Sequence, residues 1–108
     1  MAERIAISGT SPIFIGSLAN ENAGIVVFQV ADASTLAMDV QTRVTGSAGP
    51  LADTAYYNLR ANPRTVVTTG TDITANGIYA VVAPGCEVWL TPSAGSCNVD
   101  VQRVQGTL

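Results

Sequence analysis

The stretch that decides the fold is Gly77–Val104, which reads GIYAVVAPGCEVWLTPSAGSCNVDVQRV. Apolar residues recur at every second position in most of this stretch, which is the period of a half-buried β-strand. Two turn signals interrupt it, Pro84-Gly85 and Pro92-Ser-Ala-Gly95. The pattern predicts three antiparallel strands, joined by a type II turn at Pro84-Gly85 and by a four-residue loop at 92–95.

The predicted register places the apolar side chains of the three strands on one face. The first hairpin pairs Val81 with Val88, and the second pairs Leu90 with Cys97, because a slip by one residue would set apolar side chains against Asn98 and Asp100. We expect the resulting apolar face to form the core, and it comprises Tyr79, Val81, Cys86, Val88, Leu90, Cys97, Val99 and Val101.

The opposite face of the predicted three-stranded unit is only half polar. It carries Ile78, Val82 and Trp89 beside Glu87, Ser96, Asn98 and Asp100, whereas a solvated face should be polar throughout. Either a loop or the N-terminal segment of the same chain covers the apolar part, or a neighbouring subunit or a partner protein does.

The N-terminal segment contains Ile13-Phe14-Ile15, which puts apolar groups on both faces of a strand. We interpret it as a central strand, the alternative being an arm that adds to a neighbour's sheet edge. The candidate interface residues are therefore Ile13, Phe14, Ile78, Val82 and Trp89.

The rest of the chain shows the same short period, and no apolar stripe with helical spacing extends over a useful length. Further strands are predicted at 4–8, 12–17, 24–30, 38–44, 55–60 and 64–68. Asp53 is placed to cap one helical turn that reaches Tyr57. We predict an all-β fold, an antiparallel β-sandwich of jelly-roll or Ig-like type with about eight short strands, forming one domain over residues 1–108.

The amino-acid composition excludes several classes of function. Of the 108 residues only 12% are charged, His and Lys are absent, and the formal net charge is −3. This excludes His-based catalysis, Schiff-base lysines and His-ligated metals, and it makes nucleic acid an unexpected partner. No calcium-loop or phosphate-loop pattern occurs, so we expect neither metal nor cofactor. No secretory leader or apolar run of bilayer length is present, so no membrane partner is expected.

Few residues are arranged for chemistry. Glu87 and Asp100 fall on one face of the predicted hairpin, the only placement that suggests a hydrolase pair, and we predict no catalytic residues and no enzyme activity. The predicted register keeps Cys86 and Cys97 too far apart for a disulfide, so we expect two reduced, buried thiols. Trp89 with one tyrosine is a minimal basis for a sugar platform.

A resemblance rests on Ile73-Thr-Ala-Asn-Gly-Ile-Tyr-Ala-Val81, Gly85-Cys-Glu-Val88, the Gly95-Ser96 turn and Val99-Asp-Val101. In this pattern the stretch from Tyr57 to Val104 resembles the small β-sandwich proteins of tailed bacteriophage virions. The resemblance implies a capsid decoration (cement) protein that binds the major capsid protein, forms a dimer or trimer, is made in the host cytoplasm and resides in the virion. The alternatives are a tail or fibre component and a glycan-binding β-sandwich module.

Overall fold

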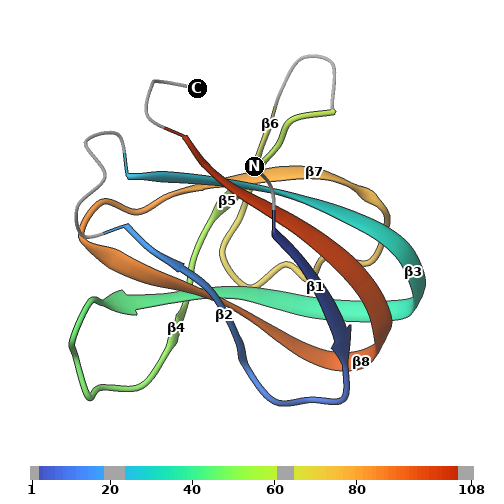
Figure 1. Cartoon of the computed structure of the whole chain (residues 1–108), viewed down its shortest axis with the longest axis horizontal. Coiled ribbons are helices and arrows are strands. Elements are labelled where there is room, and N and C mark those ends of the chain that lie inside the picture. Colours follow the sequence, from blue (N-terminus) through green and yellow to red (C-terminus); the bar gives the residue numbers. More distant parts are fainter. Residues whose placement is uncertain (1–2, 19–23, 61–64, 105–108) are drawn as a thin grey trace.

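Eight antiparallel strands make up the described chain, and they confirm the all-β prediction. The computed structural model describes residues 3–18, 24–60 and 65–104, and within these no helix occurs (Figure 1). The strands are β1 (Glu3–Ser8), β2 (Ile13–Ser17), β3 (Ile25–Val44), β4 (Ala52–Asp53), β5 (Tyr56–Asn58), β6 (Thr65–Val67), β7 (Gly77–Val82) and β8 (Cys86–Val104).

Two long strands, β3 and β8, organise the fold. They pair along nearly their whole lengths, from Ile25 opposite Val104 to Val44 opposite Cys86, with register shifts between Ala31 and Met38. At these shifts the two-stranded ribbon turns back on itself, so that its two halves lie one over the other (Figure 1). Bulges of this kind bend a strand and increase its twist, and here they convert one ribbon into the centre of both layers of a sandwich.

The remaining strands extend each half of the ribbon. In the first layer the order is β1, the second half of β8, the first half of β3, then β7, β5 and β6. In the second layer the order is β2, the first half of β8, the second half of β3, then β4. One hydrogen-bonded sheet therefore supplies both layers.

The core lies between the layers and is filled by inward-facing residues of both. It comprises Ile7, Ile15, Leu18, Val26, Phe28, Val30, Leu36, Met38, Val40, Tyr56, Ile73, Tyr79, Val81, Val88, Leu90, Cys97, Val99 and Val101. The two buried phenols keep hydrogen-bond partners, because Tyr79 donates to the Ala75 carbonyl and Tyr56 to the Thr71 carbonyl, each at 3.0 Å. Burial raises the pKa of Tyr56 to about 12.

The predicted core face is largely correct, whereas the predicted strand partners are wrong. Of its eight residues all but Cys86 are buried, and Cys86 is half-buried. Yet β7 pairs with β3 and β5 rather than with β8. The Pro84-Gly85 turn does form, with the Cys86 amide donating to the Ala83 carbonyl at 3.1 Å and Gly85 at φ +81°. It joins strands of different layers instead of closing a hairpin.

The second predicted turn does not exist. Residues Pro92 to Gly95 lie inside β8, and Pro92 is fully buried opposite Met38. The positive φ of Gly95, +77°, serves the bend of the ribbon and not a loop. Because β8 continues through this point, its two halves do not pair with each other. One long strand therefore replaces the two short strands predicted there.

Two further predictions are wrong in detail. The helical turn from Asp53 to Tyr57 is absent, since β4 and β5 are extended in this region. The segment around Phe14 is not a central strand, because β2 pairs with β8 alone among the described residues. It is an edge strand of its own chain, which puts Ile15 in the core and leaves Phe14 44% exposed.

Candidate functional site

The outer face of the second layer brings together the aromatic and charged side chains of three strands. Antiparallel register places Phe14 of β2 opposite Trp89 of β8, and Trp89 opposite Gln41 of β3. In the adjoining row Glu87 lies opposite Arg43. These residues alternate with buried ones such as Val88 and Val40, so they point away from the core. We call Phe14, Trp89, Arg43 and Glu87 the Trp89 face.

The Trp89 face is held together by its own contacts. The rings of Phe14 and Trp89 meet edge-on, with centroids 5.3 Å apart, and the Arg43 guanidinium carbon lies 5.3 Å from the centre of the Trp89 ring. Glu87 accepts hydrogen bonds from Arg43 Nε at 2.8 Å and from Trp89 Nε1 at 3.1 Å. The N-terminal segment of the same chain thus covers part of Trp89, which is one of the two explanations predicted for its surroundings.

Electrostatics keep Glu87 ionised in this arrangement. The hydrogen bond from Arg43, followed by that from Trp89, holds the pKa of Glu87 below its ordinary value. The charge of Arg43 is therefore compensated while its planar group remains stacked on an aromatic ring. Such paired, preorganised Trp and Arg side chains are the types that dominate binding energy at protein interfaces.

A polar chain continues across the same outer face. The Thr91 hydroxyl donates to Gln41 Oε1 at 2.6 Å, and Gln41 Nε2 donates to Asp53 Oδ1 at 2.9 Å. Both hydrogen bonds link neighbouring strands, from β8 through β3 to β4. The Gln41 side chain is thereby held in one orientation.

Two carboxyl groups meet beside this chain. The bridge between Met38 and Ile73, both buried, sets Asp39 next to Asp72 on the outer side. A shared hydrogen bond with Asp72, together with partial burial, raises the pKa of Asp39 to about 6. The sequence offered no signal for this pair, because Asp72 lies outside any strand and reaches Asp39 only through the fold.

The other predicted interface residues are not part of the Trp89 face. Ile78 and Val82 lie on β7 in the first layer, on its outer side, where Val82 is 45% exposed and Ile78 half-buried. Ile13, although on β2, packs against the core. The five predicted residues therefore divide into three groups. Phe14 and Trp89 are in contact, Ile78 and Val82 lie on another surface, and Ile13 is half-buried against the edge of the core.

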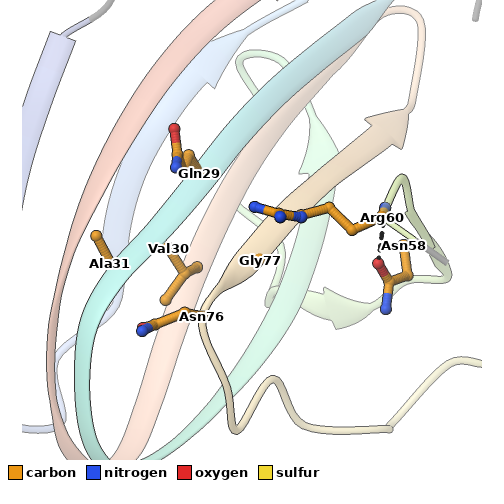
Figure 2. Close-up of a pocket in the computed structure, with 7 residues that line it drawn as sticks. All are labelled: Gln29, Val30, Ala31, Asn58, Arg60, Asn76 and Gly77. Atoms are coloured by element: carbon orange, nitrogen blue, oxygen red, sulfur yellow. Dashed lines mark hydrogen bonds between the residues drawn. The ribbon is translucent and has the colours of Figure 1, made fainter.

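A pocket of about 530 Å³ opens where β7 begins, at one end of the first layer (Figure 2). Its walls include Gln29, Val30 and Ala31 of β3, Asn58 at the end of β5, Arg60 just beyond β5, and Asn76 before β7. Figure 2 shows the Arg60 side chain extending over β7 towards Gln29. No pattern in the sequence indicates this pocket, since Arg60 and Asn76 belong to no motif and are brought together only by the strand order.

The placement of Glu87 beside Asp100, on which the hydrolase alternative depended, does not occur. Asp100 binds Arg4 through two contacts of 2.9 Å in the first layer, whereas Glu87 belongs to the Trp89 face in the second. The two carboxylates lie on different halves of the bent β8 and are each neutralised by a separate arginine. Hence the one placement that suggested acid–base chemistry is removed by the fold.

The cysteines are free thiols, as expected, but the expectation that both are buried holds for Cys97 alone. Cys97 is buried, which raises its thiol pKa, and Cys86 is half-buried. Within the described residues no group of three His, Cys, Asp or Glu side chains is arranged to hold a metal ion.

Comparisons of the chain with protein-family models, with curated proteins and with solved structures gave no match. In the described part of the chain no helix is long and apolar enough to cross a membrane. The function is therefore inferred from the chain's own residues.

Proposed function

We propose that this chain is a non-enzymatic structural protein of a phage virion, acting as a decoration protein that docks on the shell of major capsid proteins. The observation that carries the proposal is the Trp89 face, in which Phe14 and Trp89 form an aromatic surface beside the compensated pair Arg43–Glu87. A rigid aromatic and Arg surface loses little conformational entropy when a partner covers it. The low share of charged residues, 12%, also suits a surface that is buried in an assembly.

A second surface supports self-association of the protein. On the outer side of the first layer, Val82 and Val66 are 45% and 55% exposed, and Tyr57 lies beside them opposite both Ala80 and Val66. Apolar side chains gathered on the outside of a sheet are typical of contacts between copies. We propose that the dimer or trimer forms through this side and leaves the Trp89 face for the shell.

Glycan binding is the second candidate, and one contact bears on it. A sugar that stacks on tryptophan needs an open ring face, and the Arg43 guanidinium already lies over the Trp89 ring at 5.3 Å. The polar chain of Thr91, Gln41 and Asp53 nearby is of the kind that holds sugar hydroxyls, but its hydrogen bonds are satisfied internally. The contacts favour a protein partner over a glycan.

Docking on the shell is tested by co-sedimentation of the purified protein with shells assembled from the major capsid protein encoded beside its gene. Wild type is expected to sediment with the shells, and Phe14→Ala to bind about tenfold more weakly, since it removes one edge of the aromatic surface. Val44→Ala is the matched control, because it shortens an exposed apolar side chain at the end of β3 that belongs neither to the Trp89 face nor to the surface of Val82 and Val66. Failure of wild type to bind, or the absence of a capsid gene in the neighbourhood, contradicts the proposal, and signal on a glycan array supports the second candidate.

Self-association is tested separately by light scattering. Val82→Asp is expected to shift the protein towards monomer, whereas Val44→Asp, at a position 64% exposed at the end of β3, is expected to leave the mass unchanged. A monomeric wild type at all concentrations would remove this part of the proposal and leave docking on the shell untouched.

A further inference from the structure

The pocket at the start of β7 exists because β5 stops pairing before β7 does. The last contacts between these strands are Asn58 opposite Tyr79 and the amide of Leu59 donating to the Ile78 carbonyl at 2.9 Å. The next residue along β7 is Gly77, where an added Cβ would meet the Tyr79 ring at 3.0 Å on the core side, and no described residue of the β5 segment beyond Leu59 pairs with it. The opening is therefore a product of strand geometry, and its volume of about 530 Å³ lies in the range of sites for small molecules.

The two asparagines of the pocket are oriented by backbone groups. Asn58 Oδ1 accepts a hydrogen bond from the Arg60 amide at 3.1 Å, and Asn76 Oδ1 accepts one from the Ala33 amide at 2.9 Å. A backbone N–H can only donate, so in each case the oxygen of the carboxamide must face it. The amino group, Nδ2, is the end of each side chain that these hydrogen bonds leave as a donor, and in Figure 2 the amino groups of Asn58 and Asn76 lie on opposite sides of the pocket.

Arg60 adds further donors without a carboxylate to neutralise them. Among the described side chains, Arg4 and Arg43 each hold a carboxylate, at 2.9 and 2.8 Å, whereas no ion pair involves Arg60. No Asp or Glu is among the described residues that line the pocket. The guanidinium group presents up to five N–H donors and accepts none. The polar side chains of the pocket thus offer donors in excess, together with one uncompensated positive charge.

From this arrangement we infer that the pocket binds a small molecule through an oxyanion group, a carboxylate or a phosphate, held by the guanidinium of Arg60, while the amino groups of Asn58 and Asn76 donate to other polar atoms of the molecule. An oxyanion supplies acceptors for the donors of Arg60, and a planar guanidinium binds carboxylate and phosphate in bidentate fashion. The site lies in the first layer and shares no residue with the Trp89 face, so it is independent of the proposed docking on the shell.

The inference is tested by titrating the isotopically labelled full chain with sodium phosphate and, separately, with sodium glucuronate, each at constant ionic strength against sodium chloride. In nuclear magnetic resonance spectra we expect saturable shifts of the Gly77 amide and of the side-chain amino groups of Asn58 and Asn76. Shifts with phosphate alone or with glucuronate alone identify the oxyanion, and shifts with both identify a general oxyanion site. An equal response to sodium chloride, or no saturable shift with either anion, overturns the inference.

Two variants separate the site from general charge effects. Arg60→Gln is expected to weaken binding at least about tenfold, because it removes the charged donor. Arg60→Lys is expected to weaken binding less, because it keeps the charge but loses the bidentate geometry of the guanidinium group. Arg4→Gln makes the same change of net charge at a residue far from the pocket lining and should leave the affinity unchanged. Equal binding by wild type and Arg60→Gln, with both folded, also overturns the inference.

Discussion

The bend of the β3–β8 ribbon depends on Gly95. Replacement of Gly95 by alanine measures how much this glycine contributes to the free energy of unfolding. Gly95 has φ +77°, a conformation that costs a residue with a side chain about 1–2 kcal/mol. An added Cβ would also lie 2.5 Å from the Thr35 carbonyl oxygen and still closer to that of Ser34. Both atoms belong to the backbone of β3, which cannot move without opening the ribbon, so overlap should add about 1–3 kcal/mol. Gly95→Ala is therefore expected to lower the free energy of unfolding by about 2–5 kcal/mol.

Gly85→Ala supplies the matched control. Gly85 has φ +81°, close to that of Gly95, but no atom lies within 4 Å of its added Cβ. This variant should lose about 1–2 kcal/mol, from conformation alone. Both are measured by urea unfolding followed through Trp89 fluorescence, with equal slopes required for the comparison. If Gly95→Ala costs no more than Gly85→Ala, the close approach of the two backbones does not set the bend.

Three further predictions concern single side chains. The pKa of Asp39 is raised from an ordinary 3.8 to about 6 in the folded protein. Ionisation of this group therefore lowers the free energy of unfolding as pH rises from about 4 to about 6. Asp39→Asn should accordingly raise the free energy of unfolding at pH 7 by up to about 1 kcal/mol, a value reduced to allow for the solvent exposure of the group. If the variant is no more stable than wild type at pH 7, the proposed interaction of Asp39 with Asp72 is contradicted. Phe14→Ala should shift the Trp89 emission to longer wavelength and cost about 1 kcal/mol, and an unchanged spectrum would show that the ring contact does not persist in solution. A thiol reagent should label Cys86 before Cys97, because Cys97 is buried and its thiol pKa is raised; the reverse order under native conditions would contradict that burial.

The candidate site was only partly predictable. Trp89 and Phe14 could be named because each is a large apolar residue at a position where alternation demands a polar one. Their contact could not be predicted, since it depends on β2 pairing with β8. For the same reason, the sequence could not predict the stacking of Arg43 on Trp89 or the pocket lined by Asn58, Arg60 and Asn76. Each joins residues of strands whose adjacency no local pattern encodes.

By itself the sequence determined which side chains are buried. Alternation with period two is a property of a single strand, so Val88, Leu90, Val99 and Val101 point to the core whatever strand lies beside them. Likewise Pro84-Gly85 makes its turn from local dihedral preferences.

Only the tertiary structure decided which strands pair and where the chain reverses. A proline and glycine at 92–95 satisfy a tight loop as well as a bend inside a strand, and the choice depends on whether β3 lies alongside. Pairing between distant strands depends on the total free energy of many weak contacts across the whole sandwich. The residues of one segment alone do not determine that total.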